Sequence, residues 1–173
     1  MTIKVFDCSV GITEHSFTEP DILLSATVPA DLGYFGERLS AARSEIVKAW
    51  KVRSTKLQPS YRSTDIIGAL VLAGQIFDRE PRTSKKTLVI FSDMRNSTAD
   101  LDLESISYEP TIRIIAKAGT PKPADLHNVE IHIRGVDGSG KPIGYWWSLR
   151  EFWLEFFRRS DALLADYSVL RTQ

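Results

Sequence analysis

Two oxygen-bearing side chains, Thr64 and Asp93, stand where they could bind a divalent cation. Thr64 opens an apolar segment with helical character, and Asp93 closely follows the apolar run 88–91. Hydroxyl and carboxylate oxygens are hard ligands of the kind that Mg2+ prefers. Asp65, beside Thr64, could place a negative charge at the start of the helix or accept a hydrogen bond near the site. Thr64 and Asp93 are therefore the candidate metal ligands of this chain.

A purely structural interpretation of the same residues stays open. Ser63 or Thr64 could cap the N-terminus of a helix, because hydroxyl oxygens accept hydrogen bonds from the first free N–H groups. Asp93 could be a loop carboxylate that accepts backbone hydrogen bonds.

The elements that would position these side chains form an α/β pattern. Residues 64–77 are apolar almost all round, which predicts a helix inside the fold. The run 88–91 is continuously apolar, as in a parallel strand covered on both faces. In such sheets, binding sites form beyond the carboxyl ends of the strands, where Asp93 stands.

The rest of the chain supplies further alternating elements. We predict strands near Ile3 and Val5 and over residues 21–28, 129–133 and 167–170, the third with one solvent face. Residues 35–52 predict a helix with one buried stripe, in which Phe35, Leu39, Ala42, Ile46, Ala49 and Trp50 recur. The capping-box spacing of Ser148 and Glu151 predicts a second amphipathic helix. Residues 109–119 fit a short helix or an Ile-rich strand.

In this order, Thr64 and Asp93 resemble the second and third metal-ligand motifs of von Willebrand factor A domains, although Phe91-Ser92-Asp93-Met94 differs from the common Thr-Asp-Gly ending. The resemblance implies a Rossmann-like three-layer α/β fold with a mostly parallel sheet and helices on both faces. It also implies protein binding through a metal-ion-dependent adhesion site. There, Mg2+ leaves one coordination position for a partner's Asp or Glu, and catalysis is rare.

The family's first motif, Asp-x-Ser-x-Ser, is only partly matched by Asp7-Cys8-Ser9-Val10-Gly11. Helical periodicity does not follow it, so the resemblance implies that residues 3–11 are the family's second strand. We expect one von Willebrand factor A-like domain over residues 1–173 that begins one strand and one helix late. A partner strand could fill the resulting gap in the sheet. With a degenerate adhesion site, Mg2+ binding should be weak or absent.

Composition narrows the function classes. The chain has 173 residues and a formal net charge of zero, which argues against nucleic acid or an anionic membrane as partner. Cys8 is the single cysteine, so an intrachain disulfide is excluded and a reducing compartment is the default. The N-terminus has no apolar run of signal-peptide or membrane-helix length. We expect a cytoplasmic protein.

An enzyme of the α/β class, acting on a phosphate or nucleotide substrate, is the alternative. Asp93 would then be catalytic, and the glycine-rich segment 135–141 would lie near phosphate. That segment has P-loop-like spacing, but Pro142 replaces the Ser or Thr hydroxyl, so a simple turn is favoured. His15, His127 and His132 have no recognisable nucleophile beside them. The aromatic residues from Tyr145 to Phe157 are read as core, or else as an exposed protein-binding patch.

Overall fold

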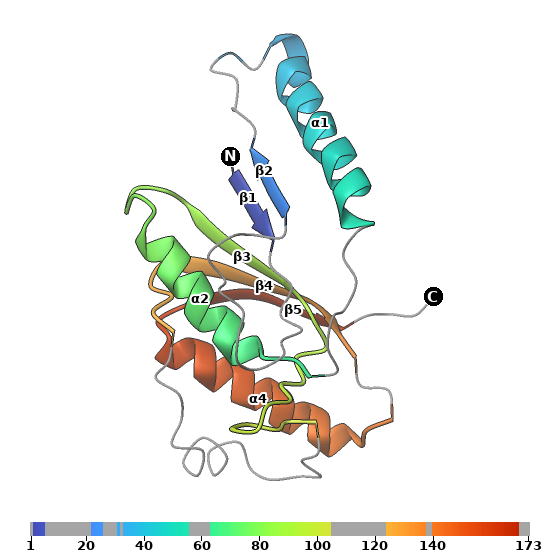
Figure 1. Cartoon of the computed structure of the whole chain (residues 1–173), viewed down its shortest axis with the longest axis vertical. Helices are drawn as coiled ribbons and strands as arrows, with labels where there is room; N and C mark the ends of the chain where they lie inside the picture. Colours follow the sequence, from blue (N-terminus) through green and yellow to red (C-terminus); the bar gives the residue numbers. More distant parts are fainter. Residues whose placement is uncertain are drawn as a thin grey trace. The chain divides into compact units, whose positions relative to one another are not determined.

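The computed structural model describes residues 2–5, 22–25, 31, 33–55, 63–104, 124–137 and 140–169. The chain divides into two compact units, Met1–Arg62 and Ser63–Gln173, and both strands and helices occur in it, so the fold is α/β (Figure 1). Asp7, Cys8, His15 and the segment 109–119 lie outside the described residues. The prediction of a single domain stays a prediction. Among the described helices, none has both the length and the apolar character needed to cross a lipid bilayer.

The first unit contains the predicted strand pair and helix. β1 (Thr2–Val5) pairs antiparallel with β2 (Ile22–Ser25). A single 3-10 turn, η1 (Tyr34–Gly36), leads into α1 (Glu37–Ser54). α1 packs on β2, and the Arg53 guanidinium donates a hydrogen bond to the Leu23 carbonyl.

The predicted stripe on this helix is only half-buried, and Phe35 does not belong to it. The φ angles of Phe35 and Gly36 are 52° and 73°, so both residues are left-handed and turn the chain before the helix begins at Glu37. The Phe35 side chain is therefore 99% exposed. Leu39, Ala42, Ile46, Ala49 and Trp50 are half-buried.

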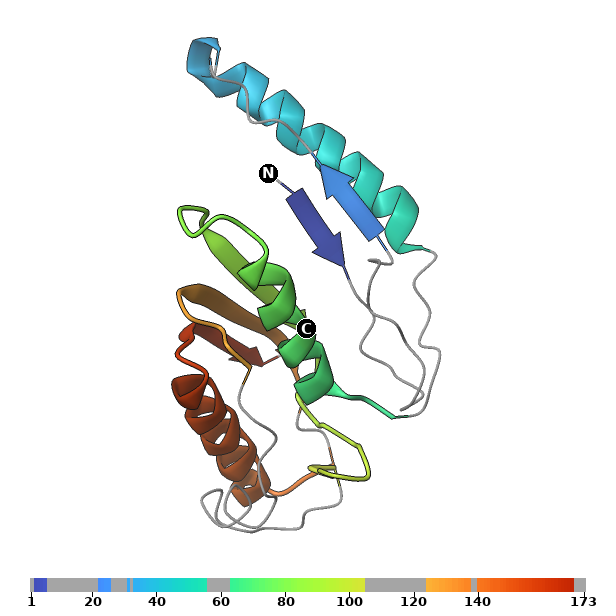
Figure 2. The same cartoon turned by 60° about the vertical axis from the view of Figure 1, so that its left-hand side comes forward.

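The second unit is built on a parallel sheet of three strands in the order β3–β4–β5. These strands are β3 (Lys86–Phe91), β4 (Val129–Val136) and β5 (Leu163–Val169). Two helices, α2 (Ile66–Asp78) and α4 (Ile143–Arg159), lie against the same face of the sheet (Figure 2). Because all three strands are parallel, their carboxyl ends meet at one edge.

The sheet of this unit is covered by helices on one face. Along β4 the apolar Val129, Ile131 and Ile133 are buried, whereas Glu130 and His132 alternate with them on the other face, as predicted. Among the described residues of this unit, the expected cover on both faces of β3 is not seen, because α2 and α4 share one face. Val89 and Phe91 are 47% and 76% exposed. A third layer stays a prediction.

Two element boundaries differ from the predictions. α4 begins at Ile143, directly after Pro142, so Ser148 lies inside the helix and does not start it. The buried stripe already begins at Tyr145, and burying it requires a helix that starts earlier. β5 begins four residues before the predicted 167–170 strand and contains Asp166, which pairs with the Arg134 guanidinium.

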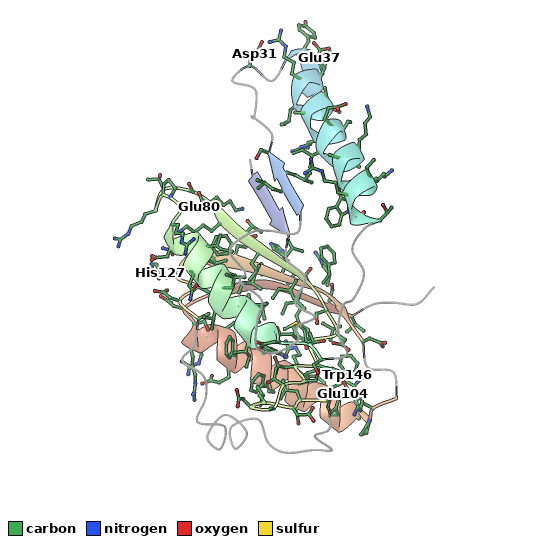
Figure 3. All side chains as sticks on the ribbon, viewed as in Figure 1. Asp31, Glu37, Glu80, Glu104, His127 and Trp146 are labelled. Carbon is green, nitrogen blue, oxygen red and sulfur yellow. The ribbon has the colours of Figure 1, made fainter. Side chains whose placement is uncertain are left out.

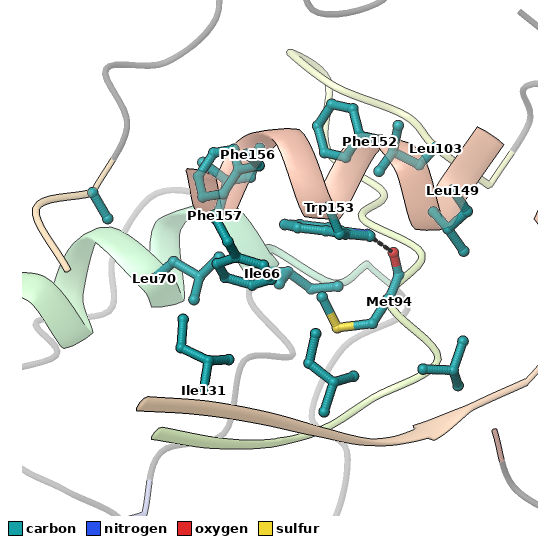
Figure 4. Packing of buried hydrophobic residues seen from close by; sticks show 14 of the residues in the cluster. Ile66, Leu70, Met94, Leu103, Ile131, Leu149, Phe152, Trp153, Phe156 and Phe157 are labelled. Atoms are coloured by element: carbon teal, nitrogen blue, oxygen red, sulfur yellow. Dashed lines mark hydrogen bonds between the residues drawn. The ribbon is translucent and has the colours of Figure 1, made fainter. Parts of the chain in front are cut away.

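The core of the second unit lies between the sheet and its two helices (Figure 4). Trp153 is fully buried at its centre, with Phe156 and Phe157 packed around it at ring-centroid distances of 5.5 and 5.9 Å. The aromatic residues of α4 are therefore mostly core, as favoured from the sequence. Trp147 is the exception at 59% exposed.

Candidate functional site at the carboxyl rim

The carboxyl ends of the strands and the starts of both helices meet at one end of the second unit. β3 ends at Phe91 and β4 at Val136, while α2 begins at Ile66 and α4 at Ile143. Glu104 and Trp146 lie at this end, whereas Glu80 and His127 lie at the opposite end (Figure 3). We call this end the carboxyl rim and define it as residues 63–66, 92–104, 137 and 141–147.

The fully buried amide of Asn96 joins the start of α2 to the residues that follow β3. Its Oδ1 accepts hydrogen bonds from the backbone N–H groups of Ile66 and Ile67, at 2.9 and 3.2 Å. Its Nδ2 donates to the Leu101 carbonyl at 2.7 Å. The first N–H groups of a helix have no partner within the helix, so Asn96 caps α2 from a segment 30 residues away.

Asp65 completes this cap. Its Oδ1 accepts the Gly68 N–H at 2.8 Å, and its backbone carbonyl accepts the Ala69 N–H at 3.1 Å. The role of Asp65 as an N-terminal charge of the helix is therefore confirmed, and the cap is neither Ser63 nor Thr64. Gly68 leaves room for this carboxylate, because a Cβ there would lie 2.2 Å from Asp65 Oδ2.

Thr64 is tied to the same turn through its backbone. Its N–H donates to Ser97 Oγ at 3.0 Å, and its carbonyl accepts the Ser97 N–H at 2.9 Å. Asp93 lies four residues before Ser97. Both predicted site residues therefore lie at the carboxyl rim beside residues 96–104, which we call the turn segment. That Thr64 and Asp93 share a metal ion stays a prediction.

The backbone between Asp93 and Arg95 is held in a sparsely populated conformation. Met94 is fully buried and has a φ of 65°, in the left-handed region that non-glycine residues rarely adopt. Its N–H donates to Ser92 Oγ at 3.0 Å, and its carbonyl accepts the indole N–H of Trp153 at 2.8 Å. The core thus fixes the direction in which the neighbouring Asp93 and Arg95 leave the strand.

Asp93 makes its interactions with Arg95. Asp93 Oδ1 accepts the Arg95 N–H at 3.0 Å, as the structural interpretation expected, and Asp93 Oδ2 lies 3.9 Å from Arg95 Nε. Arg95 Nη1 lies 3.3 Å from Glu104 Oε1, and Nη2 donates to the Asp137 carbonyl at 2.8 Å. The arginine therefore connects the end of β3, the turn segment and the end of β4.

Lys141 and Tyr145 close the other side of the rim. Lys141 Nζ lies 3.6 Å from Glu104 Oε1 and 5.1 Å from the centre of the Tyr145 ring. The Tyr145 hydroxyl donates to the Leu103 carbonyl at 3.0 Å. Burial raises the pKa of Tyr145 to about 12, against a lowering by Arg95, so the phenol stays protonated and remains a donor at neutral pH.

The remaining sequence motifs find ordinary partners. Lys141 donates to the Glu104 carbonyl, an interaction that ties it to the turn segment. Pro142 lies extended, with a φ of −68°, directly before α4. The ring nitrogens of His127 and His132 contact Asp161 and Glu130.

The sequence did not single out Arg95, Asn96, Ser97 or Glu104. A signal was present, since residues 92–100 are rich in Ser, Asn, Thr and Asp directly after a buried strand, a composition typical of hydrogen-bonded turns. Clusters of three or more His, Cys, Asp or Glu side chains able to hold a metal do not occur among the described residues.

Comparisons with protein-family models, curated proteins and solved structures gave no match for this chain.

Proposed function

We propose that this chain is a protein-binding module of the von Willebrand factor A type that contacts its partner at the carboxyl rim. The support is the order of the elements and the convergence of the start of α2 with the end of β3. The turn segment joins these two through Asn96 and Ser97. On this proposal the complete fold has three layers with helices on both faces, the protein is cytoplasmic, and it does not act as an enzyme.

The residues present fit a tightly held Mg2+ poorly. The resemblance assigns Thr64 and Asp93 as its ligands, but both carboxylate oxygens of Asp93 face Arg95. Two protein oxygens would leave an ion largely hydrated. The proposed partner contact therefore involves the side chains of the carboxyl rim and does not require a metal ion.

The observation that carries the proposal is an exposed pair of apolar residues beside charged side chains of the carboxyl rim. Ile143 and Trp147 are 76% and 59% exposed, and they lie one turn apart on the same side of α4. Lys141 lies two residues before Ile143, and the half-exposed carboxylate of Glu104 lies beside Lys141. Tryptophan is one of the residue types enriched in the hot spots of protein interfaces. The partner that fits is a protein surface with an apolar pocket for Trp147.

The proposal is tested by quantitative affinity capture from the source cells with wild-type chain, Trp147→Ala and Phe35→Ala. Phe35 is the matched control, because it is an even more exposed aromatic residue and lies in the first unit. We expect at least one protein to be retained by wild type and Phe35→Ala and to be depleted about tenfold or more by Trp147→Ala, as for a hot-spot residue. The purified protein should then show the same affinity difference. If Trp147→Ala and Phe35→Ala retain the same proteins in the same amounts, the result would contradict docking at the carboxyl rim.

A further inference from the structure

We propose that the guanidinium of Arg95 is the resident cation of the carboxyl rim, so that the rim is held together without a metal ion. Arg95 faces three oxygen groups from three segments: Asp93 Oδ2 at 3.9 Å from Nε, Glu104 Oε1 at 3.3 Å from Nη1, and the Asp137 carbonyl at 2.8 Å from Nη2. Carboxylates and a carbonyl are also what a divalent ion would gather. Here one side chain of the protein gathers them.

Burial supports this assignment. The Arg95 side chain is 12% exposed, whereas the side chains of Asp93 and Glu104 are 44% and 46% exposed. The cation is thus the inner member of the group, and its acidic partners lie between it and solvent. A buried arginine is tolerated where its donors meet acceptors, and here Nη1 and Nη2 donate to Glu104 and to the Asp137 carbonyl. The Tyr145 ring, 5.8 Å from the guanidinium carbon, adds an aromatic face.

The same geometry disfavours a divalent ion at Asp93. An ion bound to either carboxylate oxygen would approach the positive charge of Arg95, and Lys141 adds a second positive charge beside Glu104. Repulsion between like charges grows when they are partly withdrawn from water. Arginine cannot lose its proton to relieve this repulsion. Binding a divalent ion would therefore require Arg95 to leave its partners.

The test compares thermal unfolding of the full chain in MgCl2 or MnCl2, at about 10 mM to cover weak oxygen sites, with KCl of equal ionic strength. We expect the melting temperature of wild type to be the same in all three salts. Arg95→Gln should be less stable in KCl and should gain a divalent-dependent rise of several degrees, because Asp93 has lost its cation and Glu104 keeps only Lys141. The rise should vanish in Arg95→Gln/Asp93→Asn. Arg150→Gln removes an exposed arginine paired with Glu151 and should gain nothing.

Two results would overturn the proposal. The first is a divalent-dependent rise in wild type that Asp93→Asn abolishes. The second is a folded Arg95→Gln that does not respond to either ion. If Arg95→Gln does not fold, the wild-type comparison with Asp93→Asn still decides. The inference concerns the rim of the proposed function, but its test contains no partner protein. Metal independence and partner docking can therefore fail separately.

Discussion

Replacing Trp153 with alanine is expected to lower the free energy of unfolding by about 3–5 kcal/mol, the range for truncating a fully buried large aromatic residue. Trp153 is the largest fully buried side chain of the second unit, and Phe152, Phe156 and Phe157 pack against it. Its indole N–H also donates to the carbonyl of Met94. The truncation therefore leaves a cavity and a buried carbonyl without its donor. Urea unfolding followed by circular dichroism measures the loss.

Two variants separate these contributions. Trp153→Phe keeps an aromatic ring but removes the donor to Met94. Its free energy of unfolding should therefore lie between those of wild type and Trp153→Ala. Trp147→Ala removes the same side chain from an exposed position six residues earlier and should change stability within about 0.5 kcal/mol, as for ordinary surface substitutions. Equal losses for Trp147→Ala and Trp153→Ala would contradict the arrangement of the core.

Asn96→Ala is expected to cost about 2–4 kcal/mol, because a buried group without its hydrogen-bond partner costs roughly 1–3 kcal/mol and two backbone groups lose theirs. These groups are the N–H groups of Ile66 and Ile67, whereas the carbonyl of Leu101 keeps the Thr98 N–H as a donor. The site is fully buried, so water does not readily replace the amide. Urea unfolding measures the loss, and hydrogen exchange at the start of α2 should locate it.

Asp65→Ala is the matched control, since it removes the other side-chain cap of the same helix. Asp65 is half-buried and caps one N–H group, so we expect the usual cost of about 1 kcal/mol for a lost N-cap. Asn96→Asp keeps the acceptor for the two N–H groups but turns a carboxylate oxygen toward the Leu101 carbonyl in a fully buried site, so it should also destabilise the chain. If Asn96→Ala lowers the free energy of unfolding less than Asp65→Ala does, Asn96 does not join the start of α2 to the residues that follow β3.

The sequence predicted the elements whose signal is local. The alternation of Val129, Ile131 and Ile133 defined β4 and its buried face, because the period of two is set by the strand itself. The start of α4 was wrong because the Ser148–Glu151 spacing imitates a cap, while the buried stripe begins at Tyr145. The exposure of Val89 and Phe91 depends on where the helices pack, which the apolar run of β3 does not encode.

The same contrast between local sequence signals and tertiary packing holds at the carboxyl rim. Thr64 and Asp93 were brought to one rim by element order alone, since parallel strands and their helices fix which ends meet. Asn96 and Arg95 were not found, because their partners lie far along the chain: Ile66 is 30 residues from Asn96, and Asp137 is 42 residues from Arg95. Which turn residue reaches which distant backbone group depends on tertiary packing. The left-handed Met94, fixed by Trp153, sets that packing.

The arrangement around Arg95 is tested most directly by a crystal structure grown with MnCl2, because manganese gives an anomalous signal that locates the ion. We expect Arg95 to lie between Asp93 and Glu104, with Nη2 bound to the Asp137 carbonyl and without a manganese peak at Asp93. A manganese ion bound by Thr64 Oγ and Asp93, with Arg95 turned away from both carboxylates, would contradict this arrangement.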